Sequence, residues 1–427
     1  MNLRGVKGMN DVLPGEIGRW QRLEAAFRST VELHRYREVR TPLVEPTELF
    51  VRSIGEEADI VRKEMYSFDQ HGDNLTLRPE GTAGAARAYV EHGVAAREPL
   101  TRWYYLGPMF RAERPQKGRY RQFWQAGCEV YGDPGPATDA EMIDMLVSFF
   151  RELGIASVTV HLNSLGGPDT RVRYGAALVA HLEPQKDALS DDSKRRLTTN
   201  PLRVLDSKDP RDVAACEGAP SILAVLDEAD RAHFDALCRY LDRLGTPYLV
   251  DPRLVRGLDY YTRTLFEIRG SGGDLGAQNA LGGGGRYDRM VRELGGPDVP
   301  SIGFALGLER LLLAMPPDAA PEPPCVAIAP MGDVATGEAL LLARELRRLG
   351  VAADVDARGG SLKSMLRRAN AIAARVAVVI GEGELTRGTV QIKDLAQHAQ
   401  LDAPRAEAAD TIARLLAAAE PTGSAPT

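Results

Sequence analysis

Arginines and carboxylates recur beside glycine or aromatic residues in several segments of this 427-residue chain, and these segments are the candidates for chemistry. They are RPEGT (78–82), FRAE (110–113), RQFWQAGCE (121–129), RGLDYY (256–261), GGGGRYD (282–288) and SIGFALGLER (301–310). Arginine grips phosphate with a fixed fork of donors and stays charged, while glycine lets the backbone approach a ligand. An aromatic ring and an arginine can enclose a planar base. The combination predicts ATP bound on an antiparallel sheet.

Each segment also has an ordinary structural explanation when it is taken alone. An arginine on a strand is more often a surface ion pair than a phosphate ligand. GGGGRYD would be a flexible glycine loop, and Tyr260 with Tyr261 would be sheet packing. The functional interpretation is favoured because independent segments require the same ligand.

Motifs of other enzyme classes are missing from the sequence. It contains no G-x-x-x-x-G-K-[ST], no G-x-G-x-x-G at a strand–helix junction, no G-x-S-x-G and no H-E-x-x-H. The four cysteines are scattered without a C-x-x-C pair, and the seven histidines show no ligand spacing. We therefore expect no metal site, and the sequence does not favour a hydrolase or a metalloenzyme.

Length and composition indicate a globular chain with two or three domains. The apolar fraction is 44% and the charged fraction is 26%, as in ordinary globular proteins. The net charge of −6 argues against a protein that binds nucleic acid over its whole surface. Local basic tracts remain: residues 102–121 carry six Lys or Arg against one acid, and residues 361–375 carry four against none. Neither a secretory leader nor a run of ~18 apolar residues is recognisable, so we expect a cytoplasmic protein without a membrane segment.

Periodicity predicts the elements that must position the candidate residues. A helix is expected over 19–35, and a strand carrying Pro42 over 37–45. The aromatic-rich segments 101–111 and 120–131 predict a long antiparallel hairpin with a basic tip. Thr138 and Glu141 suggest a capping box for the helix that follows and that ends at Gly154.

The C-terminal hundred residues alternate strand and helix, which predicts a small α/β domain with a largely parallel sheet and a last helix over 403–419. Five prolines in residues 315–324 predict a stiff linker before it. The expected domains are a catalytic domain (1–168 and 249–320), a helical insertion (169–248), a C-terminal α/β domain (321–420) and a frayed tail (421–427).

From about residue 3 to residue 420 the sequence resembles histidyl-tRNA synthetase, a class II aminoacyl-tRNA synthetase. The segments that carry the likeness are GMNDVLP, REVRTPLVEPTELFVRSIGEE (motif 1), GPMFRAERPQKGRYRQFWQAGCEV (motif 2), SIGFALGLERL (motif 3) and the histidine signatures LVRGLDYYTRTLFE and GGGGRYD. The resemblance implies an α+β catalytic domain on a mainly antiparallel sheet, with a helical insertion and a C-terminal α/β anticodon-binding domain. It also implies a homodimer, formed through the motif 1 segment that contains Pro42.

The resemblance assigns the ATP site to residues from distant segments. Arg111 would hold the α-phosphate and the carboxylate of histidine, and Arg256 would lie near the α-phosphate, which makes these two the catalytic candidates. Glu113 would contact the adenine side, Phe123 would stack on the base, and Arg310 would cover its other face or reach the γ-phosphate. Mg²⁺ on the pyrophosphate leaving group is expected from the charge of the triphosphate.

L-Histidine recognition is assigned to acids, phenols and an amide. The resemblance places Glu80, Thr82 and Gln125 around the α-amino group, and Glu129, Tyr260, Tyr261 and Tyr287 around the imidazole. A pocket that pairs both ring nitrogens rejects apolar isosteres, because its own polar groups would be left unpaired.

For tRNA(His), the resemblance points to the hairpin tip and the C-terminal domain. Arg114, Gln116 and Arg121 would touch the acceptor end, and the basic stretch 361–375 would meet the phosphate backbone or the anticodon loop. That stretch departs from the family pattern, with LKSMLRRAN where a Lys-Gln pair is more usual.

Two alternatives stay open at the level of sequence. A non-catalytic paralogue, such as the regulatory subunit of ATP phosphoribosyltransferase, keeps the fold but typically loses ATP-site residues and the C-terminal domain. Another ATP-dependent ligase on a similar sheet would lack the histidine signatures. Histidine-dependent exchange of pyrophosphate with ATP separates all three.

Overall fold

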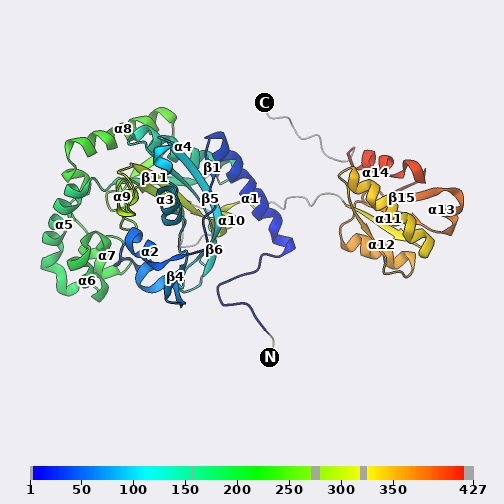
Figure 1. Ribbon diagram of the computed structural model, residues 1–427, viewed down its shortest axis with the longest axis horizontal. Helices are drawn as coiled ribbons and strands as arrows, with labels where there is room; N and C mark the ends of the chain where they lie inside the picture. Colours follow the sequence, from blue (N-terminus) through cyan, green and yellow to red (C-terminus); the bar gives the residue numbers. More distant parts are fainter. Residues whose placement is uncertain (1–2, 156, 271–278, 318–324, 418–427) are drawn as a thin grey trace. The chain divides into compact units, whose positions relative to one another are not determined.

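Two compact units make up the chain in the computed structural model (Figure 1), residues Met1–Ala320 and Pro321–Thr427. The structure describes residues 3–155, 157–270, 279–317 and 325–417. Most of the predicted linker (318–324) and the predicted frayed tail (421–427) lie outside these residues. Among the described residues, no helix is long and apolar enough to cross a membrane.

An eight-stranded sheet is the scaffold of the first unit, in the order β1-β5-β6-β11-β10-β9-β7-β8. Its strands are β1 (Arg37–Glu38), β5 (Thr101–Phe110), β6 (Gln122–Tyr131), β7 (Val158–Ser164), β8 (Tyr248–Val250), β9 (Thr262–Gly270), β10 (Ala280–Arg286) and β11 (Ser301–Gly307). The six central strands pair antiparallel, and only the edge pairs β1–β5 and β7–β8 are parallel. The mainly antiparallel sheet and the β5–β6 hairpin are thus confirmed.

Helices cover one face of this sheet, and the other face carries the site with further helices packed beside it. The helices outside the 169–248 range are α1 (Pro14–Leu33), α2 (Thr47–Ile54), α3 (Thr82–Glu91), α4 (Pro136–Glu152), α9 (Met290–Glu293) and α10 (Leu308–Ala314). Phe27 of α1 and Phe149 of α4 pack with Cys128 and Val130 of β6 in one buried cluster. Because side chains alternate along a strand, the odd-numbered residues of β6 face the opposite side.

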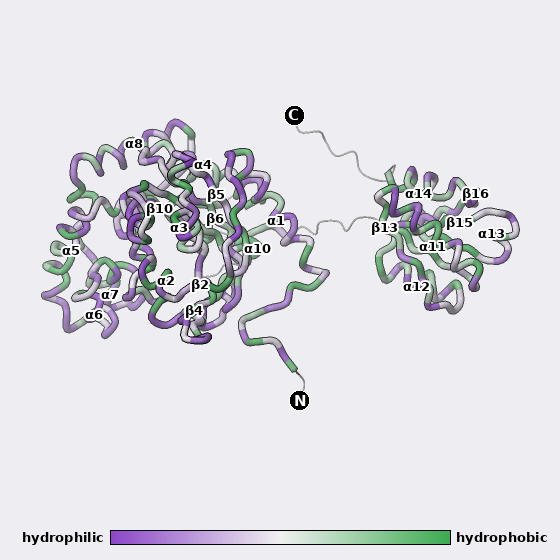
Figure 2. Tube along the Cα trace, in the orientation of Figure 1, coloured by the Kyte–Doolittle hydropathy of each residue, from purple (hydrophilic) through white to green (hydrophobic). Residues whose placement is uncertain are grey.

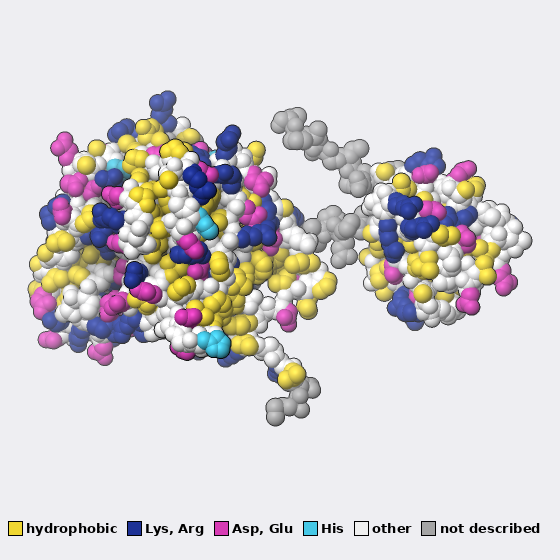
Figure 3. Space-filling model, viewed as in Figure 1, with side chains coloured by type: hydrophobic (Ala, Val, Ile, Leu, Met, Phe, Trp, Pro, Cys, Tyr) yellow, Lys and Arg dark blue, Asp and Glu magenta, His cyan; other side chains and the backbone are white. Residues whose placement is uncertain are grey.

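The 169–248 range is helical, as its periodicity predicts. It contains most of α5 (Pro168–Leu182) together with α6 (Asp191–Thr199), α7 (Pro210–Ala215) and α8 (Glu228–Leu244). Hydrophilic residues recur along these helices (Figure 2), and each helix buries only one side. On the face of the first unit seen in Figure 3, Lys and Arg are interspersed with Asp and Glu, in keeping with the net charge.

Two local predictions are wrong. The capping box fails because α4 begins at Pro136 after Gly135, and the Thr138 hydroxyl instead donates to Asp133 at 2.5 Å. The single strand over 37–45 is two short strands in different sheets, because the chain leaves the first sheet before Pro42, which has no N–H to donate. The second of them belongs to a three-stranded sheet in the order β2-β4-β3, formed by β2 (Val44–Pro46), β3 (Tyr66–Gln70) and β4 (Asp73–Leu77).

The second unit is a five-stranded sheet with helices, in the order β13-β12-β14-β15-β16. Its elements are β12 (Cys325–Pro330), α11 (Asp333–Arg348), β13 (Ala352–Val355), α12 (Leu362–Ala371), β14 (Val376–Ile380), α13 (Glu382–Arg387), β15 (Thr389–Asp394), β16 (Ala399–Pro404) and α14 (Ala408–Ala417). The α/β class is confirmed.

The prediction of a largely parallel sheet in this unit is correct for only two of the four strand pairs. β13, β12 and β14 are parallel, whereas β14–β15 and β15–β16 are antiparallel. The carboxylate of Asp394 accepts the N–H groups of Ala396 and Gln397, which turns the chain back to form β16. The last helix therefore begins at Ala408 rather than near 403, because residues 399–404 pair with β15.

Candidate active site

A cavity of ≈140 Å³ lies on the open face of the central sheet and collects most of the candidate residues. Those that line it are Glu80, Thr82, Arg111, Glu113, Phe123, Gln125, Arg256, Tyr260, Tyr261, Tyr287 and Arg310. Glu129 is fully buried beneath it and is linked to it through Tyr287. Arg114, Gln116 and Arg121 belong to the described hairpin connection and lie outside this lining.

Strand β6 supplies one wall because its odd-numbered residues share a face. Phe123, Gln125 and Glu129 follow one another along this face. The register sets Gly107 of β5 beside Gln125, and Gly303 of β11 beside Glu129. The base-stacking candidate Phe123 and two of the histidine-binding candidates, Gln125 and Glu129, therefore lie in one line along a single strand.

Glycines of β10 and β11 leave space on the sheet surface beneath the site, because they carry no side chain. A Cβ at Gly303 would lie 1.7 Å from Oε2 of Glu129, and a Cβ at Gly283 would lie 3.1 Å from the Arg256 guanidinium. The segment GGGG is part of strand β10 rather than a flexible loop, so that interpretation is wrong. These glycines are needed where two polar side chains lie flat against the sheet.

Three guanidinium groups that are far apart in sequence converge on the cavity. Arg111 donates from Nε to the Pro79 carbonyl at 2.9 Å, and its guanidinium lies 5.1 Å from the centroid of the Phe123 ring. Arg310 donates to the carbonyls of Gly118 (3.2 Å) and Ala280 (2.7 Å), and Arg256 pairs with Glu267.

Electrostatics show that these cations act on one another. Burial lowers the pKa of Arg310, and the like charges of Arg119, Arg111 and Arg256 lower it further. Because buried charges require compensation, a cluster of this kind suits a ligand with several negative charges. The observed convergence therefore fits a polyphosphate group.

Arg119 also lines the cavity, although it was not among the individual candidates. Its Nε lies 2.5 Å from Oε2 of Glu113, which makes an ion pair at the cavity rim. Glu267, which holds Arg256, was missed as well. Arg119 and Glu267 both occur in segments that resemble family motifs. Their ion pairs depend on how the strands and the hairpin fold, which the spacing of residues along the sequence does not show.

Glu129 is held by two tyrosine hydroxyls. Tyr287 donates to Oε2, and Tyr105 donates to Oε1 at 3.2 Å. Burial raises the pKa of Glu129 to about 8 despite these bonds. Tyr105 was missed by sequence analysis, and its ring fits because Gly81 and Gly127 leave room: a Cβ at either would approach it to 2.2 or 2.4 Å.

Glu80 and Gln125 fix the segment that opens α3. The two Glu80 oxygens accept the N–H groups of Thr82 (2.9 Å) and Ala83 (2.7 Å), and Gln125 Oε1 accepts the N–H of Gly81 (3.0 Å). Burial raises the pKa of Glu80. A cationic ammonium group would stabilise this carboxylate in its charged form.

Arg121 is engaged within the hairpin. Its Nε donates to the carbonyl of Glu113 at 3.1 Å, and its backbone N–H donates to Gly8 at 2.7 Å. Gln116 pairs with Arg119 through an isolated bridge that closes the tip. The N-terminal segment around Gly8 therefore braces the base of the connection.

A wider hollow of ≈860 Å³ adjoins the cavity and extends to the helical segment. Arg111, Arg256 and Arg310 line both spaces. On the helical side the lining includes Arg196, Arg203, Asp206 and Lys208. Cations from segments that flank the sheet strands and from the helical segment thus face one continuous space within the first unit.

An antiparallel sheet with a long hairpin, glycine-rich strands and convergent arginines over one cavity defines the catalytic domain of a class II aminoacyl-tRNA synthetase. Residues 8–170 and 192–311 match the Histidyl-tRNA synthetase family, and residues 325–415 match the Anticodon binding domain. The chain belongs to the histidyl-tRNA synthetase family.

Individual relatives agree over nearly the whole chain. It is 60% identical over 423 residues to the histidine–tRNA ligase of Sorangium cellulosum (strain So ce56), covering 99% of both chains. It is 48% identical to that of Geobacter metallireducens, covering 94% of this chain and 97% of the relative. Among solved structures, apo histidyl-tRNA synthetase of S. aureus matches with a TM-score of 0.81 and 34% identity, covering 96% of this chain and 99% of that one.

Glu129→Gln tests the polar end of the cavity. We expect the KM for histidine to rise roughly 10- to 100-fold, since a charged hydrogen bond is worth about 1.5–3 kcal/mol, with the KM for ATP within about twofold. Pyrophosphate exchange at varied histidine concentration measures both KM values.

Because the pKa of Glu129 is raised to about 8, its carboxylate forms as the pH rises through that value, and the difference in histidine KM between wild type and Glu129→Gln should grow there. Equal histidine KM values at every pH would remove Glu129 from the pocket.

Proposed function

We propose that the protein joins L-histidine to tRNA(His) in two steps, through a histidyl-adenylate formed from histidine and ATP. The observation that carries this proposal is the convergence of Arg111, Arg256 and Arg310 on one cavity whose other end holds Glu80, Gln125 and Tyr287. Membership of the histidyl-tRNA synthetase family and relatives named histidine–tRNA ligase support it.

In the first step, a carboxylate oxygen of histidine attacks the α-phosphorus of ATP and pyrophosphate leaves. The carboxylate is already ionised, so the step needs positioning and charge stabilisation rather than a strong base. Arg111 would hold the α-phosphate beside the histidine carboxylate. Arg256, held by Glu267 against Gly283, would face the charge that develops on the phosphate.

The adenine would lie against the ring of Phe123, with Glu113 at its edge. Arg310 would cover the second face of the base or reach the γ-phosphate. Its two bonds to the Gly118 and Ala280 carbonyls fix the direction of its guanidinium. An aromatic ring and a guanidinium on opposite faces suit a planar base.

Magnesium would arrive with ATP. Among the described residues, no three acidic, histidine or cysteine side chains group closely enough to hold a metal ion. This fits Mg²⁺, which binds mainly through substrate phosphates and water with one or two carboxylates. Glu80, Glu113 and Glu309 line the cavity and are the carboxylates that could complete its coordination. When bound, the ion would shield the charge of the leaving pyrophosphate.

Histidine would lie with its ammonium group near Glu80, Thr82 and Gln125. Its imidazole would lie toward Glu129 and Tyr287, with Tyr260 and Tyr261 as the adjoining wall. The rings of Tyr260 and Tyr287 pack edge to face with their centroids 5.7 Å apart, and they would bound the space for the imidazole ring. An apolar analogue would offer no ring nitrogen to the remaining hydrogen-bonding capacity of Glu129 and the phenols, which carries an energetic cost.

In the second step, a terminal hydroxyl of the tRNA attacks the carbonyl of the adenylate, and AMP leaves. The wide hollow beside the cavity would admit the acceptor end, with Arg114, Gln116 and Arg121 at the hairpin. In the C-terminal unit, Lys363 and Arg367 of α12 would contact tRNA phosphates. Arg368 and Arg375 instead pair with Asp356 and Asp394.

The domain roles follow the same proposal. Residues 1–168 and 249–320 would carry catalysis, 169–248 would approach the acceptor stem, and 321–420 would bind the anticodon. The protein would work as a cytoplasmic homodimer joined through the segment that contains Pro42. A regulatory paralogue is not favoured, because this chain retains the three site arginines and the C-terminal unit.

Exchange of labelled pyrophosphate into ATP tests the first step. We expect exchange that depends on histidine, and charging of tRNA(His) when tRNA is added. A regulatory paralogue would bind histidine without exchange, whereas another ligase would respond to a different substrate. Absence of histidine-dependent exchange in folded protein would contradict the proposal.

Arg256→Ala tests the catalytic cation. We expect kcat of exchange to fall by roughly 10²- to 10³-fold, the usual loss when one preorganised charge or donor at a transition state is removed. Arg239→Ala, at an exposed position of α8, is the control and should retain full activity. An unchanged kcat in Arg256→Ala would exclude it from the reacting centre.

Salt dependence tests the tRNA contacts of α12. We expect tRNA binding to weaken steeply with salt, and Lys363→Ala with Arg367→Ala to reduce the slope of log K against log [salt] by roughly 1.5 to 2. Filter binding between 50 and 300 mM salt would measure it. A slope identical to that of the wild-type protein would place these side chains away from phosphates.

A further inference from the structure

We propose that the helical segment Pro168–Leu244 positions the histidine pocket from behind, with Arg171 of α5 and His233 of α8 as the positioning residues. The inference rests on the proposed function and concerns how its amino-acid pocket is held. None of the described residues of this segment lines the ≈140 Å³ cavity, so neither side chain would touch histidine. Any effect on histidine recognition would pass through the residues they hold.

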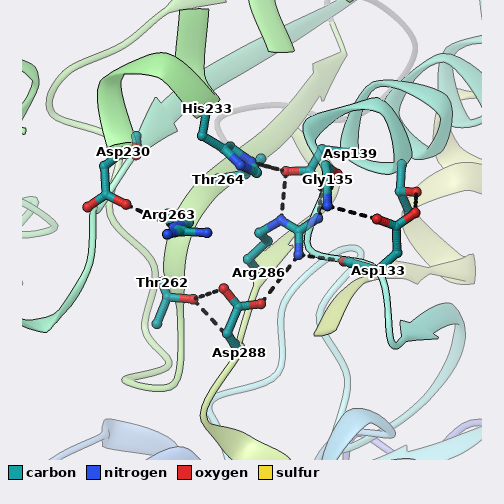
Figure 4. Close-up of polar contacts among 12 residues, drawn as sticks. Asp133, Gly135, Asp139, Asp230, His233, Thr262, Arg263, Thr264, Arg286 and Asp288 are labelled. Atoms are coloured by element: carbon teal, nitrogen blue, oxygen red, sulfur yellow. Dashed lines mark hydrogen bonds and ion pairs between the residues drawn. The ribbon is translucent and has the colours of Figure 1, made fainter. Parts of the chain in front are cut away.

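Arg286, next to Tyr287 in the chain, is the centre of the first arm (Figure 4). Its side chain is fully buried, and all its donor nitrogens are used. Its guanidinium donates to both Asp139 oxygens, at 2.6 and 3.0 Å. It also donates to the carbonyls of Asp133 (2.9 Å) and Gly135 (2.8 Å) and to the Asp288 carboxylate (3.3 Å). A buried guanidinium satisfied in this way has one orientation.

This orientation fixes Tyr287 on Glu129. The Tyr287 backbone N–H donates to the Ser301 carbonyl at 2.9 Å, while its hydroxyl donates to Glu129. Asp288 accepts the N–H of Ser301 at 3.0 Å. Residues on both sides of Tyr287 are therefore anchored, and the phenol has little freedom to turn away from the carboxylate.

Helix α8 completes the first arm through Asp139. His233 Nε2 lies 2.9 Å from Asp139 Oδ2, and the Thr264 hydroxyl donates to the same oxygen at 2.5 Å. Burial raises the pKa of Asp139, but the bonds from His233 and Arg286 outweigh it and hold the pKa below its usual value. Asp139 is thus a carboxylate shared by α8, β9 and Arg286, as Figure 4 shows.

Helix α5 supplies the second arm, at the adjoining wall of the pocket formed by Tyr260 and Tyr261. Arg171 donates from one terminal nitrogen to the carbonyls of Asp259 (3.0 Å) and Tyr261 (3.2 Å). Asn200, which follows α6, donates to the Asp259 side chain at 2.9 Å. These bonds hold the turn that carries Tyr260 and Tyr261.

Both tyrosine walls are therefore tied to one helical segment, Tyr287 through Arg286–Asp139–His233 and Tyr261 through Arg171. Loss of either arm should loosen the amino-acid end of the cavity. At the ATP end, Arg111 bonds to the Pro79 carbonyl and lies against Phe123, and Arg310 bonds to the Gly118 and Ala280 carbonyls, all of which lie outside the helical segment. The expected signature is a change in histidine recognition without a matching change in ATP recognition.

His233→Leu removes the bond to Asp139 at nearly constant volume. We expect the KM for histidine in pyrophosphate exchange to rise about 3- to 10-fold, the equivalent of one net hydrogen bond, with the KM for ATP within about twofold. His233→Gln keeps a donor and should restore most of the histidine affinity. His181→Leu is the matched control, since His181 of α5 bonds only to the Ala215 carbonyl of the same segment among the described residues.

Arg171→Met provides an independent variant should His233→Leu fail to fold, and the same selective rise in the KM for histidine is expected. The inference is overturned if folded Arg171→Met or His233→Leu keeps the wild-type KM for histidine, or if the KM values for histidine and ATP rise together. Wild-type protein without histidine-dependent exchange would instead contradict the proposed function. The two failures are therefore distinguishable.

Discussion

Repulsion among buried guanidinium groups is the constraint on which the site depends. Arg111, Arg119, Arg256 and Arg310 line one small cavity, and the pKa of Arg310 is lowered by burial and by the other three. Each of these arginines is held by a carbonyl or a carboxylate of the sheet, the hairpin or the segment that precedes α3. A polyphosphate would supply the opposite charge, so the repulsion among these cations favours a ligand with several negative charges.

The rigid support is an antiparallel sheet with glycine where the ligands must lie close. Gly303 and Gly283 leave room for Glu129 and Arg256 to lie against the surface of the sheet. Glycine weakens a strand, but here β10 lies between β9 and β11, and pairing on both sides offsets that weakness. The same residues that reduce local strand propensity therefore shape the cavity floor.

At the opposite end of the cavity, the buried carboxylates are held by phenols and backbone N–H groups. Glu129 accepts two phenolic hydroxyls and Glu80 accepts two backbone N–H groups, and burial raises the pKa of both. An amino acid with an ammonium group and an imidazole complements both. One end of the cavity is thus lined by guanidinium groups and the other by carboxylates, which in the proposed function would orient histidine relative to ATP.

The sequence by itself determined the residue types and the local elements. Aromatic-rich, strand-like segments predicted the β5–β6 hairpin, which put Phe123, Gln125 and Glu129 on its second strand. Only the tertiary structure decided that Tyr105 holds Glu129, that Glu267 holds Arg256, and that GGGG is a strand. These contacts join strands through sheet register, and residues such as Arg286 and Asp139 are 147 positions apart. Local patterns carry no record of such pairs, because burial and register arise only when the whole sheet has formed.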